Sequence, residues 1–330
     1  MAWIAGVVAL IASCAAPGTA AVKPLPLPGG EGGIGFDDLQ YAPELHRLLV
    51  PAGRTGALDL VDPATGAVEQ VTGFTADARY GGGHGEGTTS AVLGGGRIFA
   101  IDRSALQLDV VDPGKRAIVA HAKLAASPDY VRFVAQTGEV WVTEPDAEQI
   151  EVFTLGADDT PASAARIRVA GGPESLVISA RRKTAYTHLW NGVTVAIDVA
   201  ARKVGARWKN GCDGSRGIAL DDERGWLFTG CAEGKVTAAD VDHGGARLAE
   251  ARTGAGVDII AYAPGRARIY APGGKAATLT VLAVGERAAL RALASVPVTA
   301  GAHCAVTDDA GGVWVCDPKH GRLLAVTSAP

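Results

Sequence analysis

The chain has 330 residues, of which 48% are hydrophobic and 20% are charged, and it carries a formal net charge of -4 at pH 7. This apolar content is sufficient for a large core and excludes an intrinsically disordered chain. The charges are spread without a basic block, which argues against a protein that binds nucleic acid through its phosphates. The 44 glycines and the single methionine favour many turns and few helices, and therefore an all-β fold.

Residues 1–21 are predicted to be an export signal. Residues 4–12 form an apolar run that is too short to span a bilayer. Two processing sites fit the sequence: a lipobox-like site at Cys14, whose thiol would carry a lipid, and cleavage after Ala20 or Ala21. Both place the mature domain, residues 22–330, outside the cytoplasm of a bacterium, in the periplasm or on the outer membrane. Membrane contact is expected only through a lipid on Cys14.

Short β-type apolar runs recur along the chain at intervals of about 42 to 50 residues, the length of one four-stranded propeller blade. Each run is too short and too rich in β-branched or aromatic residues for a helix. The seven runs are 47–50, 97–100, 139–142, 184–187, 226–229, 268–271 and 312–315. One strand precedes each run and further strands follow it, so we predict a single all-β domain, a seven-bladed β-propeller of four-stranded antiparallel blades.

The last repeat lacks a fourth strand, because only a few residues follow the strand-like run at 322–326. Residues 22–27 alternate like a strand, and their prolines suit an edge position that needs few ladder donors. We therefore predict that this N-terminal segment supplies the missing outer strand of the seventh blade and closes the ring.

Segments 47–68 and 195–204 resemble the YVTN-repeat (YncE-like) β-propellers of exported bacterial proteins. At the level of the repeat, the resemblance covers nearly the whole mature chain and implies a seven-bladed propeller. The tetrapeptide that names the family is replaced, for example by Leu-Val-Pro-Ala at 49–52. The resemblance implies no particular activity, since propellers serve in binding, scaffolding and catalysis alike.

Four cysteines follow the predicted signal, an even number for an exported chain. Cys212 and Cys231 flank one predicted hairpin turn almost symmetrically, and Cys304 and Cys316 flank another. Residues placed in this way face each other on neighbouring strands. We therefore predict the disulfides Cys212–Cys231 and Cys304–Cys316; the alternatives are four buried thiols or a soft metal site.

Loops that enter the innermost strands of a propeller gather around the central channel. One residue per blade at this place gives Asp38, His84, Asp129, Glu174, Arg216, Asp258 and His303. All of these except Arg216 are candidate ligands of a divalent metal ion, or candidate acid and base groups. The ends of the second strands add Asp102, Glu144, His188 and Asp317. The alternative is a water-filled channel lined by ordinary polar side chains.

The loop 80–89 is rich in glycine around His84 and Glu86, so a ligand could approach its backbone closely next to an imidazole and a carboxylate. A wide turn between blades is the alternative. Trp190 could stack on a sugar or an aromatic ligand, or it could cover the core of a neighbouring blade. The candidate ligand-binding residues are therefore His84, Glu86, Glu144, His188, Trp190 and Arg216.

The sequence contains no Ser-His-Asp elbow, dinucleotide fingerprint, haem-attachment motif or paired metal-binding CxxC. It favours an exported binding protein whose polar funnel takes a small molecule, a glycan or a protein partner. The alternative is a metal-dependent hydrolase or lyase that uses the funnel carboxylates and histidines. His303 and His320 are similar to the histidine pair of streptogramin lyase, and the lactonases are the other enzymes of this type.

Overall fold

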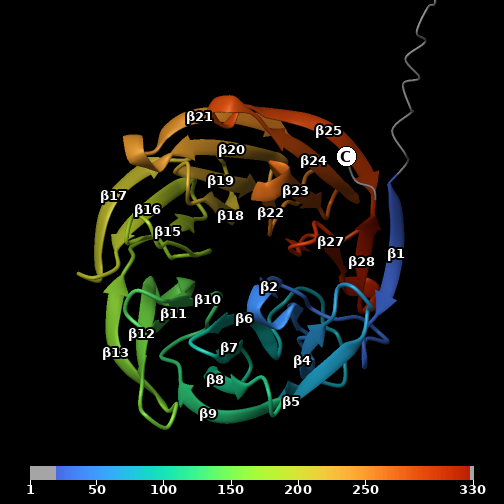
Figure 1. Ribbon diagram of the computed structural model, residues 1–330, viewed down its shortest axis with the longest axis vertical. Coiled ribbons are helices and arrows are strands. Elements are labelled where there is room, and N and C mark those ends of the chain that lie inside the picture. The colour runs from blue at the N-terminus through green and yellow to red at the C-terminus, as the bar shows by residue number, and fades with distance from the viewer. Residues whose placement is uncertain (1–19, 328–330) are drawn as a thin grey trace, which may run out of the picture.

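The computed structural model describes residues 20–327, which form seven four-stranded antiparallel sheets arranged around a central axis (Figure 1). The predicted all-β seven-bladed propeller is therefore confirmed. Cys14 and most of the predicted signal lie outside the described residues, although Ala20 and Ala21 lie within them.

Six blades consist of four consecutive strands each, numbered from the channel outward. Blade 1 contains β2 (Gln40–Ala42), β3 (Arg47–Pro51), β4 (Thr55–Val61) and β5 (Val68–Ala76). Blade 2 contains β6 (Thr88–Gly94), β7 (Arg97–Asp102), β8 (Gln107–Asp112) and β9 (Ala117–Lys123). Blade 3 contains β10 (Val131–Val134), β11 (Glu139–Glu144), β12 (Gln149–Leu155) and β13 (Pro161–Arg168).

The following three blades have the same order. Blade 4 contains β14 (Val177–Ser179), β15 (Thr184–Leu189), β16 (Val193–Asp198) and β17 (Lys203–Lys209). Blade 5 contains β18 (Ser215–Asp221), β19 (Trp226–Cys231), β20 (Lys235–Asp240) and β21 (Ala246–Arg252). Blade 6 contains β22 (Ala261–Ala263), β23 (Arg268–Gly273), β24 (Thr278–Val284) and β25 (Leu290–Pro297).

Blade 7 joins the two ends of the chain. It contains β26 (Ala305–Thr307), β27 (Val313–Asp317), β28 (Arg322–Thr327) and, as its outermost strand, β1 (Ala21–Pro26). Strands β1 and β28 run antiparallel from the pair Ala21 and Thr327 to the pair Pro26 and Arg322 (Figure 1). The predicted closure by the N-terminal segment is therefore confirmed, and its prolines occupy an outer edge, where missing N–H donors are tolerated.

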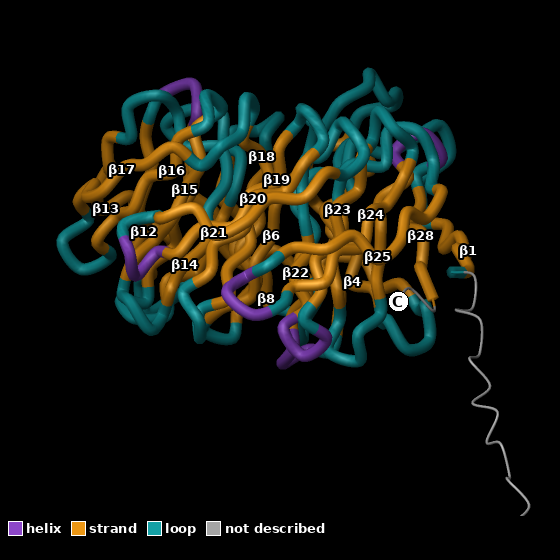
Figure 2. The backbone as a smooth tube through the Cα atoms, turned by 90° about the horizontal axis from the view of Figure 1, so that it is seen from above, coloured by secondary structure: helices purple, strands orange, loops and turns teal. Residues whose placement is uncertain are grey.

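The burial of each strand follows from its place in the blade. The second strand of each blade packs against the sheets of the blades on both sides, and β11 is buried at all six positions. The outer strand β9 contains only exposed and half-buried residues. Large buried side chains such as Trp141, Phe99 and Phe228 fill the space between sheets, as in other face-to-face sheet packing. Turns and loops cover the two open faces of the ring (Figure 2).

Short 3₁₀ turns connect several of the strands. They are η1 (Pro43–Leu45), η2 (Pro145–Ala147), η3 (Val241–His243), η4 (Pro264–Arg266), η5 (Glu286–Ala288) and η6 (Pro318–His320). Within residues 20–327, no helix is long and apolar enough to cross a membrane.

Both predicted disulfides are present. Cys212 and Cys231 have Cα atoms 5.3 Å apart, and those of Cys304 and Cys316 are 5.5 Å apart, which is within the usual range for bridged cysteines. Two disulfides indicate an oxidising compartment.

Candidate functional site

A cavity of about 550 Å³ opens where the loops that enter the innermost strands meet. We call it the funnel cavity. Its charged and aromatic lining residues come from blades 2 to 6 and are His84, Arg103, Asp129, Asp146, Glu174, Trp190, Arg216 and Asp258. The predicted convergence of loops therefore produces one concave site that carries charges of both signs.

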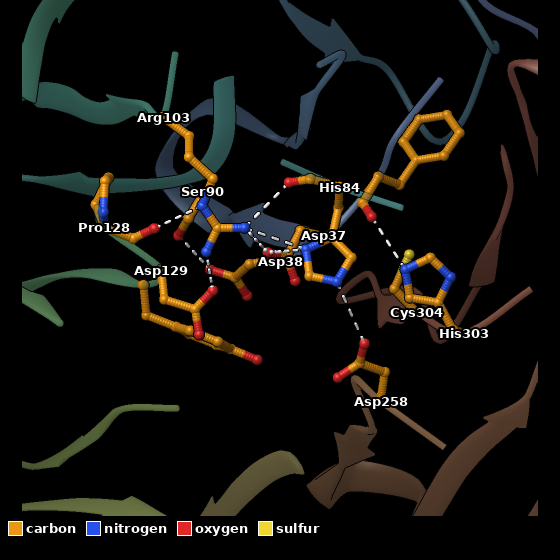
Figure 3. Close-up of polar contacts among 12 residues, drawn as sticks. Asp37, Asp38, His84, Ser90, Arg103, Pro128, Asp129, Asp258, His303 and Cys304 are labelled. Atoms are coloured by element: carbon orange, nitrogen blue, oxygen red, sulfur yellow. Dashed lines mark hydrogen bonds and ion pairs between the residues drawn. The ribbon is translucent and has the colours of Figure 1, made fainter. Parts of the chain in front are cut away.

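An ion pair fixes His84 at the wall of the funnel cavity. Its Nδ1 lies 3.0 Å from Oδ2 of the buried Asp37, and its Nε2 lies 3.9 Å from Oδ2 of Asp258 (Figure 3). The charge of Asp37 raises the pKa of His84 to about 10, so the imidazole is protonated at neutral pH. Burial opposes the ionisation of Asp37, but the charges of His84 and Arg103 prevail and lower its pKa.

A glycine allows the segment before Asp37 to lie against the loop that carries His84. A Cβ atom at Gly35 would collide with the carbonyl oxygen of Gly83 and lie 3.1 Å from Cα of His84. Only a residue without a side chain permits this close approach of two backbones. The glycine required by this contact is therefore Gly35, outside the loop 80–89, whereas a Cβ atom at Gly82, Gly83 or Gly85 would meet nothing within 4 Å.

Arg103 ties the His84 loop to blade 3. Its Nε donates to the carbonyl of Pro128 at 2.7 Å, its Nη1 donates to the carbonyl of His84 at 3.1 Å, and its Nη2 pairs with Oδ1 of Asp129 (Figure 3). Asp129 is 5% exposed, and burial together with the charges of Asp37 and Glu174 raises its pKa well above the usual value.

Glu174, Trp190 and Arg216 form the opposite corner of the site. Nη1 of Arg216 donates to Oε1 of Glu174 at 2.9 Å, and the indole N–H of Trp190 donates to Oε2. The guanidinium of Arg216 lies 4.8 Å from the ring centroid of Trp190, whose side chain remains half exposed. Burial, reinforced by the charge of Asp258, raises the pKa of Glu174 to about 7 despite its ion pair with Arg216.

His303 stands beside the funnel cavity. Its ring centroid lies 5.8 Å from that of His84, its Nδ1 lies 2.7 Å from the carbonyl oxygen of Gly301, and its Nε2 lies 3.0 Å from that of Phe36. These two contacts hold blade 7 against the segment before Asp37.

Asp38 lies elsewhere, in a second cavity of about 260 Å³ toward the opposite ends of the innermost strands. Its Oδ2 accepts from Nη1 of Arg132 at 2.6 Å and from the hydroxyl of Ser90 at 2.6 Å. Of the two adjacent aspartates, Asp37 contacts His84, whereas Asp38, the residue expected in the funnel, pairs with Arg132.

Three predicted ligand-binding residues do not line the funnel cavity: Glu86, Glu144 and His188. The buried Glu144 accepts from the backbone N–H of Ala126 at 3.0 Å, and burial raises its pKa. His188 is buried, with Nδ1 2.9 Å from the hydroxyl of Thr194, and burial lowers its pKa to about 3. Glu144 and His188 thus serve the packing of the blades.

The two other residues expected at the ends of second strands have comparable roles. Asp102 accepts from the backbone N–H of Thr75 in the preceding blade at 2.6 Å. Asp317 is fully buried and accepts from Nε of Arg322 at 2.7 Å within blade 7. His320, the second histidine of the predicted pair, has its Nδ1 2.9 Å from Asp317.

Four of the six candidate metal ligands, His84, Asp129, Glu174 and Asp258, line the same cavity. They do not form a close cluster. Within residues 20–327, three or more ligating groups with atoms inside 4.8 Å of one another occur only around the two disulfides, in one case with His303 and in the other with Glu233. No three of these side chains therefore offer ligating atoms within 4.8 Å of one another, although Nε2 of His84 lies 3.9 Å from Oδ2 of Asp258.

Asp37 and Arg103 were not among the site residues predicted from the sequence. The available signal for Arg103 was its position directly after the end of the second strand of blade 2, next to the predicted Asp102. For Asp37, the only signal was its place beside Asp38.

No protein-family model matches the chain, and no curated protein matches it. Solved structures do. A chain of hydrazine synthase from Kuenenia stuttgartiensis superposes with a TM-score of 0.73 at 14% identity, covering 91% of this chain and 97% of that one. Streptogramin B lyase gives 0.72 at 13% identity, with 93% and 97% covered, and U3-55K gives 0.74 at 12% identity, with 92% and 98% covered. At these identities the similarity establishes the propeller fold alone.

Proposed function

We propose that this propeller is a binding protein that holds a small polar molecule in the funnel cavity. The observation that carries the proposal is the cavity itself: its volume of about 550 Å³ falls within the range of small-molecule sites. Its side chains are held in place by contacts such as those of Arg103 with two carbonyls and Asp129. A site ordered in advance loses less entropy when a ligand binds.

The charge pairing favours binding over the metal-dependent hydrolase or lyase. Asp129 and Glu174 are each paired with an arginine, and the protonated His84 has no free lone pair for a metal ion. A divalent ion in the funnel would have to displace these cations. The four candidate ligands fit an organic molecule that touches several walls better than a single ion.

Trp190 gives this ligand an apolar surface. It is 51% exposed, and in the described part of the chain the one other exposed large hydrophobic residue is Val119, at 41%. A half-exposed indole beside hydrogen-bonding groups suits the ring of a sugar or another small molecule with one apolar face. A glycan end or a small metabolite thus fits the cavity better than a flat protein surface does.

The proposal is tested by a thermal-shift screen with sugars, amino acids, amines and carboxylic acids at millimolar concentration. We expect at least one compound to raise the Tm of the wild type and of Trp226→Ala, but not of Trp190→Ala. Trp226 is a matched control, because Arg224 lies 5.2 Å from its ring centroid in the same manner but outside the cavity lining.

A screen in which no compound stabilises the protein contradicts the proposal. The same holds for a ligand whose effect survives in Trp190→Ala.

We also propose that the protein works outside the cytoplasm, as a periplasmic protein or an outer-membrane lipoprotein of the YVTN-repeat type. The two disulfides support an oxidising compartment. Intact-mass analysis of the protein from membrane and periplasmic fractions tests this. A diacylglyceryl group on Cys14 indicates the lipoprotein, a chain starting at Ala21 or Val22 indicates simple secretion, and an unprocessed cytosolic chain contradicts export.

A further inference from the structure

The funnel cavity has more acidic than basic groups once its ion pairs are counted. His84 is paired with Asp37, Arg103 with Asp129, and Arg216 with Glu174. Asp258 has no such partner among residues 20–327: within 4.0 Å its carboxylate meets only Nε2 of His84, at 3.9 Å, which is longer than a hydrogen bond. Asp146 adds a further, exposed carboxylate at the rim. The lining can therefore accept one more positive charge.

One carboxylate oxygen in the wall also lacks a donor. Asp129 is 95% buried, since only 5% of its surface is exposed. Its Oδ1 pairs with Arg103, whereas its Oδ2 accepts no hydrogen bond from the part of the chain that the structure describes. Because Asp129 lines the cavity, a ligand can supply the missing donor.

A bare metal ion does not suit this arrangement. Asp129, Glu174 and Asp258 are not among the residues whose ligating atoms lie within 4.8 Å of one another. An ammonium group on an organic body suits it better, because its N–H donors can pair with one or two of these carboxylates and the body occupies the rest of the cavity. Trp190 offers that body an apolar face.

We propose that the ligand of the funnel cavity is a small organic molecule with an ammonium group, which binds among Asp129, Glu174 and Asp258 while its body lies toward Trp190. This inference rests on the proposed binding function and specifies the chemistry of its ligand. Glucose-like neutral molecules and carboxylates are then poor ligands, because they leave the surplus of negative charge unmatched.

Binding of this ligand is coupled to a proton. Burial raises the pKa of Glu174 to about 7, so the empty cavity holds a proton on a fraction of the molecules at neutral pH, and an ammonium group favours the ionised form. If only ionised Glu174 binds, the affinity rises about tenfold between about pH 6 and pH 8. The charged or hydrogen-bonding groups that act on Glu174 are Arg216, Trp190, Asp258, Asp129 and Arg103.

Calorimetric titration of the full mature protein with three series of matched probes tests the inference. One series is tyramine, tyrosol and 4-hydroxyphenylacetate, which share an aromatic body and end in an ammonium, a hydroxyl and a carboxylate group. The others are 5-aminopentanol, 1,5-pentanediol and 5-hydroxypentanoate, and ethanolamine, ethylene glycol and glycolate. The amines of all three series are protonated throughout the pH range used. We expect at least one amine to bind at least tenfold more tightly than its alcohol and its carboxylate.

Two variants locate the site. Asp258→Asn is expected to weaken binding of the amine at least tenfold, whereas Asp213→Asn leaves it unchanged. Asp213 is an exposed aspartate just before β18, outside the cavity lining. Its replacement removes one negative charge, as Asp258→Asn does. Glu174→Gln is expected to reduce the pH dependence between about pH 6 and pH 8, in which the wild-type affinity changes about tenfold.

The outcomes separate the two proposals. If no amine binds, or if an alcohol or a carboxylate binds as tightly as its amine, the ammonium inference is overturned; the proposed binding function stands if Trp190→Ala still abolishes binding of another compound. If Mg²⁺ or Ca²⁺ alone binds more tightly than any amine and loses this affinity in Asp258→Asn, the site is a metal site and the inference is overturned. If nothing in either experiment binds, both proposals fail.

Discussion

Asp59 does not line the funnel cavity, but its buried carboxyl group affects the stability of the fold. It lies in β4, is fully buried, and accepts a hydrogen bond from Nε2 of Gln70 at 2.8 Å. Burial raises the pKa of Asp59 to about 7. Asp109 occupies the same place in β8, and burial raises its pKa to about 6.

The raised pKa of Asp59 makes the folded state bind more protons than the unfolded state between its usual pKa of 3.8 and about 7. The free energy of unfolding therefore falls as the pH rises through this window and stays low above it. Asp59→Asn removes the charge, and we expect it to raise the free energy of unfolding at about pH 8 by on the order of 1–3 kcal/mol. Urea denaturation at about pH 5 and pH 8 measures this, with Asp213→Asn as the exposed control. An equal effect at both pH values contradicts the prediction.

His188 has the opposite pH dependence. Burial lowers its pKa to about 3 from its usual 6.5, so the unfolded state binds more protons in this window. The stability is then lost as the pH falls from about 6.5 toward 3. His188→Gln, which cannot be protonated, should unfold less steeply with acid than the wild type, as measured by circular dichroism during an acid titration. An unchanged acid midpoint and slope would argue against a role for His188.

The residue scale is also where the sequence is least informative. Asp37 and Asp38 are neighbours of the same chemical type, and a shift of one residue decides which of them meets His84 and which meets Arg132. The repeat pattern predicts which residue faces the channel to within one or two positions along the chain. The contact with His84 depends on distances of a few ångströms, which no periodicity in the sequence encodes. The pairing of Arg103 with Asp129 was missed for the same reason.

Strand β1 is the element that closes the ring. Its six residues pair with β28, and without it the outer edge of β28 is left open. We expect a chain that starts at Gly35 to have a clearly lower Tm and urea midpoint than a chain that starts at Ala21. Equal midpoints for the two chains would show that closure contributes nothing to stability.

The two disulfides each join neighbouring parts of the chain, with sequence separations of 19 and 12 residues. Loops of this length correspond to about 3 kcal/mol of stabilisation in the loop-entropy account. We expect the double variant Cys304→Ser/Cys316→Ser, and separately Cys212→Ser/Cys231→Ser, to lose roughly this free energy of unfolding in urea denaturation. The wild type treated with a reductant should lose stability in both places, and no loss under reduction would contradict the prediction.

Elements were easier to predict than contacts. The seven apolar runs all lie in second strands, from β3 to β27, because burial between two blades requires a nearly continuous apolar segment. The register of a hairpin is local, and it places Cys304 opposite Cys316, directly beyond the pair Ala305 and Val315. In the other hairpin Cys231 pairs with Ser215, and its disulfide partner Cys212 lies just before β18. The contacts around the cavity join residues of different blades, so the sequence could indicate the residues but not which of them pair with one another.

At the scale of the whole molecule, the closure of the ring and the funnel cavity are connected. The segment after β1 is held to blade 7 by hydrogen bonds from the N–H of Leu27 to Gly321 and from that of Ile34 to Pro318. A few residues later it supplies Asp37, the partner of His84. Loss of β1 would thus loosen a side chain that fixes the charge at the cavity wall.

The pairing of β1 with β28 also sets the order in which the molecule is completed. The hydrogen bond from the hydroxyl of Thr327 to the carbonyl of Ala21 joins residues 306 positions apart. During synthesis, β1 is the first strand of the propeller to be made and its partner is the last. A chain released before Arg322 therefore has blades 1 to 6 complete, but its strand β1 has no partner. This unpaired strand edge distinguishes an unfinished copy from a finished one.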